Sequence, residues 1–126
     1  MLSRAYANSG ASYSLAVVVD ASLWVADALY GDAHHSIASA WIVSHRSTDL
    51  AVPTLALAEV AGAVARRSSA AVAVRAVQDM RVIPHIQIVP LDEQLALEAA
   101  RLAATHRLRG ADAVYVAVAA RLRMTC

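Results

Sequence analysis

The fold follows from the segment SLAVVVD at residues 14–20, in which a short apolar run ends at an aspartate. The three successive valines favour an extended strand, and a run without polar residues from 15 to 19 indicates a strand buried on both faces. Such strands are typical of parallel sheets covered by helices. Asp20 follows at the carboxyl end, where open α/β sheets bind ligands. Position alone suits a functional carboxylate and a helix N-cap equally well.

The segments after Asp20 alternate between helical and extended patterns. Apolar spacing predicts helices at residues 21–30, 33–45, 55–67, 70–81 and 111–123, another that begins after Asp92, and strands at 50–52 and 86–89. We expect Gly31 to end the first helix, and Asp32, Thr54 and Asp92 to cap later ones. Strands that alternate with helices predict an α/β fold with a parallel sheet. No repeat or linker divides residues 15–126, which we treat as one domain.

The composition excludes several classes of protein. The hydrophobic fraction is 59% and the mean hydropathy +0.49, yet no apolar run approaches the roughly 18 residues that span a bilayer. We attribute the apolar excess to buried helices and an oligomer interface. With 11 basic and 10 acidic residues, charge alone does not indicate nucleic-acid binding. A single cysteine excludes an internal disulfide. Residues 1–14 lack the apolar core of a signal peptide, so we expect a flexible tail and a cytoplasmic protein.

Two further carboxylates stand in apolar segments. Glu59 lies within a predicted helix, where an unpaired buried charge is costly. Asp112 lies in the first turn of the last predicted helix, where the helix dipole favours a negative charge. Each has a plain alternative, since Glu59 suits a solvent edge and Asp112 a cap. Together with Asp20 they would supply hard oxygen ligands for Mg²⁺ or Mn²⁺, and the cation would offset their mutual repulsion.

Other polar groups carry weaker signals. Neighbouring side chains on a helix point about 100° apart, so His34 and His35 do not suit one metal site. The arginine clusters at residues 66–67, 107–109 and 121–123 suit either RNA phosphates or solvated helix faces, and RNA binding is assigned to none of them. A small-molecule-binding α/β domain finds no support, because the sequence contains no glycine-rich phosphate loop.

Four stretches together resemble the PIN domains of VapC-type toxins. They are VVVDAS at 17–22, VPTLALAEV at 52–60, IVPLD at 88–92 and LRGADAVYVA at 108–117. The resemblance covers nearly all of residues 15–124. It implies a three-layer fold with a central parallel sheet flanked by helices, a homodimer, and metal-dependent endoribonuclease activity. It also implies a cognate antitoxin that blocks the site. By residue, the metal-holding and catalytic acids correspond to Asp20, Glu59 and Asp112, and Ser22 corresponds to the small polar residue that supports the first acid.

The sequence departs from the family's pattern in one respect. In the family the last helix leads into a short strand with a further acidic or amide residue, whereas this sequence ends at Cys126. We therefore expect a fold without its last edge strand and a site of three carboxylates. An alternative function follows, in which a catalytically weak or inactive module binds an antitoxin or a homologous subunit.

Overall fold

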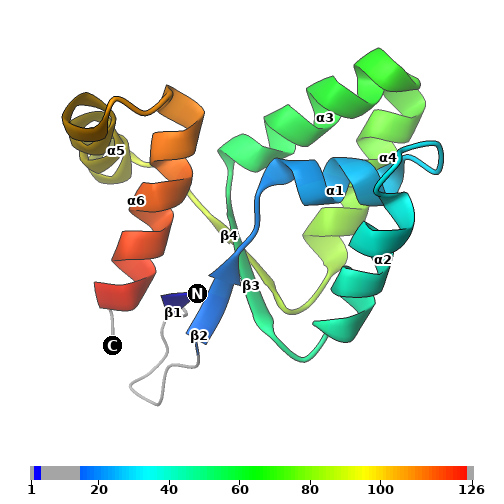
Figure 1. Ribbon diagram of the computed structural model, residues 1–126, viewed down its shortest axis with the longest axis horizontal. Coiled ribbons are helices and arrows are strands. Elements are labelled where there is room, and N and C mark those ends of the chain that lie inside the picture. The colour runs from blue at the N-terminus through cyan, green and yellow to red at the C-terminus, as the bar shows by residue number, and fades with distance from the viewer. Residues whose placement is uncertain (1, 4–14, 125–126) are drawn as a thin grey trace.

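The computed structural model describes residues 2–3 and 15–124 and contains a four-stranded sheet (Figure 1). Its strands β1 (Leu2–Ser3), β2 (Leu15–Val18), β3 (Asp49–Pro53) and β4 (Ile86–Val89) lie in the order β1-β2-β3-β4. Strands β2, β3 and β4 are parallel, with Val17 beside Leu50 and Val52 beside Ile88. The predicted α/β class and parallel sheet are confirmed.

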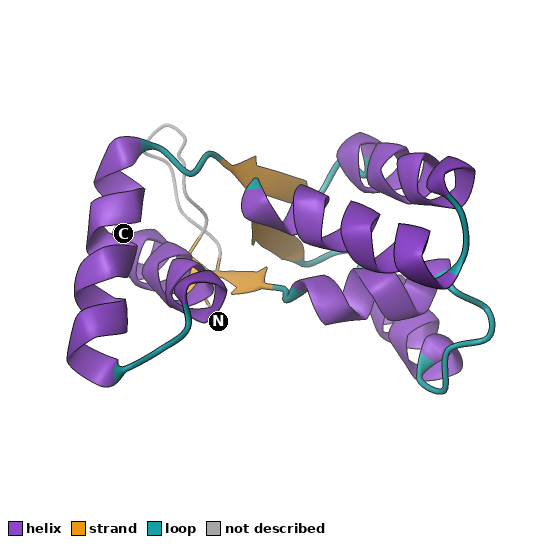
Figure 2. Cartoon of the chain, turned by 90° about the horizontal axis from the view of Figure 1, so that it is seen from above, coloured by secondary structure: helices purple, strands orange, loops and turns teal. Residues whose placement is uncertain are grey.

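Helices cover both faces of the sheet. On one side lie α1 (Ala21–Ala28), α2 (His35–Ser44), α3 (Leu55–Arg67) and α4 (Ala70–Val82), and on the other α5 (Glu93–His106) and α6 (Gly110–Met124) (Figures 1 and 2). Side chains alternate across a strand, so Leu50 and Val52 face the α1–α4 core while Ala51 faces the α5–α6 core. All three are fully buried. This gives the predicted three-layer arrangement.

Strand β1 was not predicted. It pairs antiparallel with β2, with Leu2 opposite Ala16 and Ser3 opposite Leu15. The remainder of the segment for which we expected a flexible tail, residues 1 and 4–14, lies outside the described residues, as do residues 125–126. In the part of the chain that the structure describes, no helix is long and apolar enough to cross a membrane.

Three predicted helix caps were wrong. Helix α1 ends at Ala28 with Leu29 as its C-cap, so Gly31 does not end it. Helix α2 begins at His35 without a side-chain cap, because Asp32 instead accepts the His34 N–H at 2.7 Å and pairs with Arg67 at 2.8 Å. Thr54 has helical backbone angles (φ −55°, ψ −28°) and does not cap α3. A side-chain cap needs extended backbone at that position.

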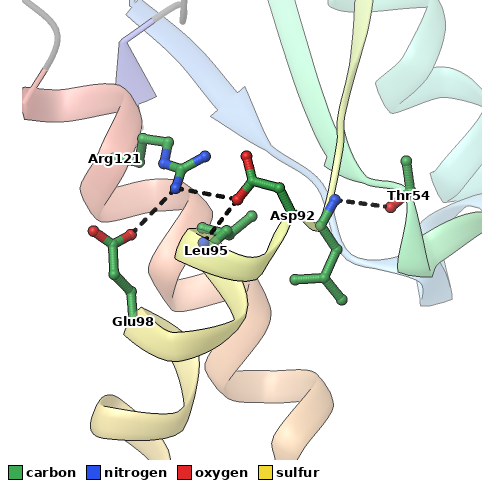
Figure 3. A network of polar contacts seen from close by, with 6 residues as sticks. Thr54, Asp92, Leu95, Glu98 and Arg121 are labelled. Carbon is green, nitrogen blue, oxygen red and sulfur yellow. Dashed lines mark hydrogen bonds and ion pairs between the residues drawn. The ribbon is translucent and has the colours of Figure 1, made fainter.

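Polar contacts join β4, α5 and α6 at one edge of the α5–α6 layer (Figure 3). Asp92 caps α5 as predicted, because its Oδ1 accepts the Leu95 N–H at 2.8 Å. The Arg121 Nη2 on α6 lies 3.7 Å from Asp92 Oδ1 and 3.6 Å from Glu98 Oε1. Thr54 Oγ1 accepts the Leu91 N–H at 3.1 Å, which connects the ends of β3 and β4. The contacts thus fix the start of α5 against α6.

The cap at Asp92 yields a prediction on stability. The Leu95 N–H, and to a smaller extent Arg121, hold the pKa of Asp92 below its ordinary value of 3.8. The ionised carboxylate therefore stabilises the fold above that value, and the contribution is lost as the pH falls below 3.8 through the folded-state pKa. We expect Asp92→Ala to lower the melting temperature at pH 7, and the difference from the unaltered chain to shrink below pH 4.

Thermal unfolding, monitored by circular dichroism at pH 7 and at pH 3, checks this expectation. Asp79→Ala is the matched control, because Asp79 is exposed and forms a surface pair with Arg75 at 3.6 Å. Such pairs contribute little, so this control should change little at either pH. A deficit of Asp92→Ala that is equally large at pH 3 and pH 7 would show that the ionised form is not what stabilises α5.

Candidate active site

Asp20 stands at the carboxyl end of the β2 segment, immediately before α1. Its backbone is extended (φ −71°, ψ 151°), as in an N-cap, but its side chain accepts no capping hydrogen bond from the helix. The carboxylate instead accepts the Ser22 hydroxyl at 3.1 Å on Oδ2, and both residues are exposed. The capping alternative for Asp20 therefore fails, and its carboxylate points where a ligand can reach it.

Glu59 lies near the middle of α3 and is half-buried. Its Oε1 accepts the Tyr115 hydroxyl at 2.7 Å, so the charge that sequence reasoning found costly has a donor inside the fold. Glu59 still reaches solvent at the cleft, so its position combines partial exposure with a contact to α6 from the other helical layer. Glu59 and Asp20 line the same cleft.

Tyr115 joins the three segments that carry the site. Its hydroxyl donates to Glu59 and accepts the Ala21 N–H at 3.2 Å, next to Asp20. Burial, followed by the bond to Glu59, raises the pKa of Tyr115 above its ordinary value of 10.0. The hydroxyl therefore keeps its proton and remains a donor at neutral pH. The nearby Asp20 charge acts in the same direction.

Sequence reasoning did not assign Tyr115 to the site. The available signal was its spacing, since it follows Asp112 by three residues in a helix of small apolar side chains, and therefore shares a face with that acid. A tyrosine among alanines and valines usually buries its ring and directs its hydroxyl to a partner. The sequence could not show that the partner is Glu59, because the two residues are 56 positions apart.

The cleft has a volume of about 840 Å³ and lies between α1, α2 and α3. Asp20, Ser22 and Glu59 line it together with Arg66 and Arg67, two helical turns further along α3. Most of the remaining lining is apolar and includes Leu23, Val25, Ala26, Ile37, Ala38, Ala58 and Ala63. The site therefore combines carboxylates, guanidinium groups and apolar surface in one groove.

Asp112 is placed differently from the other two acids. It lies in the first turn of α6, where its Oδ2 is 3.4 Å from Arg109 Nε, and both side chains are largely exposed. It is not among the residues that line the cleft. Among the residues that the structure describes, no group of three or more His, Cys, Asp or Glu is spaced to hold a metal ion. The fold thus brings Asp20 and Glu59 together and leaves Asp112 one helical turn from Tyr115.

The donor chemistry of this site suits a hard divalent cation. Carboxylate oxygens are the ligands that Mg²⁺ and Mn²⁺ prefer, and Asp20 and Glu59 present them at one end of a cleft open to solvent. Asp112 would complete such a set only if its exposed side chain left Arg109. Exposed ion pairs of this kind are weak, so the exchange has a low cost.

Comparisons with known proteins agree with the geometry. A family model described as PIN domain matches residues 17–126. The crystal structure of the Mycobacterium tuberculosis toxin VapC20, described as cleaving the sarcin-ricin loop, superposes with a TM-score of 0.71 at 23% sequence identity, over 82% of this chain and 79% of that one. At this identity the similarity concerns the fold. No curated protein matches the sequence.

The hydroxyl bridge of Tyr115 yields a second prediction. Tyr115→Phe removes the donor to Glu59 and leaves the Ala21 N–H without its acceptor, so we expect the free energy of unfolding to fall by about 1–3 kcal/mol. Urea denaturation measures this change. Tyr30→Phe is the control, because the side chain of Tyr30 is 90% exposed, and its effect should stay within about 0.5 kcal/mol. Equal effects of the two substitutions would contradict the bridge.

Proposed function

Because the chain belongs to the PIN domain family, we propose that it is a VapC-like toxin, a metal-dependent endoribonuclease that hydrolyses RNA phosphodiester bonds. The observation that carries the proposal is the pair of carboxylates, Asp20 and Glu59, that line one open cleft, with the Tyr115 hydroxyl bonded to Glu59 and to the backbone N–H of Ala21 beside Asp20. The two carboxylates lie at the carboxyl-end side of the parallel sheet, which is where α/β proteins bind their ligands. The fold similarity to a toxin described as cleaving the sarcin-ricin loop supports RNA as the substrate.

In this proposal Asp20, Glu59 and Asp112 hold Mg²⁺ or Mn²⁺. When bound, such a cation would supply a more acidic water and offset charge on the phosphate oxygens. The chain's own residues orient the ligands. The Ser22 hydroxyl fixes one oxygen of Asp20, and the Tyr115 hydroxyl fixes one oxygen of Glu59. Each carboxylate then has its second oxygen for the cation, while the half-buried position of Glu59 limits its other conformations.

The partners of the chain form part of the same proposal. We propose a cognate antitoxin that covers the cleft, a homodimer, and a cytoplasmic location. The apolar cleft wall supports a protein partner, since Ile37 on α2 is 71% exposed there. Val74 and Val82 on α4 are also exposed, as expected of surfaces that pack against another chain.

A second candidate function is favoured by the position of Asp112. Its pairing with Arg109, and the lack of a three-ligand group among residues 2–3 and 15–124, would suit a catalytically weak module that binds an antitoxin or a homologous subunit. This module would retain the cleft but hold a cation poorly. The two candidates differ in one result, which is metal-dependent cleavage of RNA.

The proposed activity predicts a specific pattern of loss. We expect the purified chain to cleave at least one RNA from a panel of structured RNAs in the presence of Mg²⁺ or Mn²⁺, and EDTA to abolish cleavage. Asp20→Asn, Glu59→Gln and Asp112→Asn should each lower kcat/KM about 100-fold or more, because the change of a metal-holding carboxylate costs at least as much as that of its supporting groups. Gel electrophoresis of end-labelled RNA measures the rates.

Asp79→Asn is the control, because this exposed aspartate on α4 does not line the cleft. It should cleave at the unaltered rate. Full activity of Asp20→Asn would remove the central residue of the proposal. If Asp112→Asn stays active while Asp20→Asn and Glu59→Gln do not, the catalytic site consists of Asp20 and Glu59 without Asp112. A folded chain that binds an antitoxin but cleaves none of the RNAs would favour the second candidate.

A further inference from the structure

The two adjacent arginines in the cleft differ in their partners. Arg67 Nη1 lies 2.8 Å from Asp32 Oδ2, and the side chain of Asp32 is only 14% exposed. The His34 N–H, followed by the Arg67 guanidinium, holds the pKa of Asp32 below its ordinary value, so that carboxylate is ionised and neutralises Arg67. Arg66 also lines the cleft, and no described residue forms an ion pair or hydrogen bond with it. It therefore offers a cation without a protein partner.

The side chain of Arg66 folds back along α3. A methyl group added at Gly62 would lie 3.2 Å from Arg66 Nη1, so the guanidinium rests over Gly62, one helical turn before its own backbone. Gly62 itself lines the cleft one turn after Glu59. The missing side chain at position 62 thus makes room for a cation on the cleft wall, displaced from the end of α3 toward the carboxylates.

The guanidinium of Arg66 is close enough to Asp20 and Glu59 for one RNA strand to contact all three residues. Seven residues separate Glu59 from Arg66, about 10 Å along the helix axis, and the folded-back side chain shortens that separation. A guanidinium binds two phosphate oxygens in a fixed fork, which suits a phosphodiester better than a single carbonyl. The carboxylate end of the cleft repels an RNA strand, so a cation beside it offsets part of that repulsion.

The cleft wall indicates which form of RNA would lie there. Leu23, Ile37 and Ala63 present apolar surface in the cleft that the carboxylates and Arg66 also line. In a duplex the bases are stacked inside, and a protein meets mainly phosphates and sugar hydroxyls. An unpaired strand can instead turn its bases onto apolar side chains while its phosphates reach polar groups. The apolar wall therefore favours a single-stranded loop over a helix.

We infer that Arg66 binds a phosphate of single-stranded RNA whose cleaved phosphodiester lies at the Asp20 and Glu59 end of the cleft, with bases of that strand against the apolar wall. This inference rests on the proposed function and deepens it. It makes Arg66 a residue that positions the substrate strand, and it aligns that strand with α3. Arg67 has no such role, because Asp32 already occupies its guanidinium.

Cleavage kinetics test the assignment. With an RNA that the unaltered chain cleaves, Arg66→Gln should raise KM about tenfold and change kcat less than threefold, because the lost contact acts on binding. The negative slope of log(kcat/KM) against log[salt] should become less steep by about 1, the change expected for the loss of one phosphate contact. Arg66→Lys should recover part of the affinity, since it keeps the charge and loses the fork.

Arg81→Gln is the matched control. Arg81 is exposed in the last turn of α4 and does not line the cleft, so KM and the salt slope should stay at the unaltered values. Thermal melting of both variants should match the unaltered chain. If Arg66→Gln unfolds, Arg66→Lys carries the test, because lysine keeps the positive charge. If Arg66→Lys leaves KM unaltered, charge remains the cause only if the salt slope is unaltered too.

Two outcomes would overturn the inference in distinguishable ways. If the unaltered chain cleaves RNA and Arg66→Gln retains both KM and the salt slope, Arg66 does not contact the strand, while the proposed function stands. If the unaltered chain neither binds nor cleaves any RNA of the panel, the proposed function fails and the inference with it. If Arg66→Gln loses binding to a protein partner but keeps its KM for RNA, Arg66 belongs to a protein interface.

Discussion

The site depends on one hydroxyl group that crosses from one helical layer to the other. Tyr115 belongs to α6, on the α5–α6 side of the sheet, yet it donates to Glu59 on α3 and accepts from the backbone at the start of α1. Burial and the Glu59 charge keep that hydroxyl protonated. Because its two partners lie on α3 and at the start of α1, this bridge sets the position of Glu59 relative to the backbone beside Asp20.

Some charged side chains around the cleft form ion pairs within the chain, and others remain available to a ligand. Asp32 and Arg67 neutralise each other, and Asp92 and Glu98 surround Arg121 away from the cleft. Among the residues that the structure describes, Tyr115 donates to Glu59 and Ser22 donates to Asp20. A cation is therefore favoured at one end of the groove and an anion at the other. A cleft that combines carboxylates, the Arg66 guanidinium and apolar surface suits RNA, whose backbone is charged and whose bases are not.

The backbone pattern was largely predictable, and two of the errors share a cause. Strands with apolar runs and helices with regular apolar spacing were identified because local periodicity reflects which face is buried. The errors at Gly31, Asp32 and Thr54 all concern caps, and at Asp32 and Thr54 the side chain has a partner distant in the sequence. Asp32 pairs with Arg67 and Thr54 accepts from Leu91, so neither serves the helix beside it. Asp92 caps α5 as predicted, because its partner is three residues away.

By itself, the sequence determined the α/β class, the parallel strands and the acids expected at the site, because burial and carboxylate chemistry are properties of residues and their local spacing. The tertiary structure alone decided which acids meet. It placed Asp20 and Glu59 on one cleft, bonded Tyr115 to Glu59 and to the backbone beside Asp20, and left Asp112 with Arg109. It also distinguished Arg66 from Arg67, two identical neighbours in the sequence. The reason is that pairing depends on distances between segments tens of residues apart, which the packing of helices on the sheet sets.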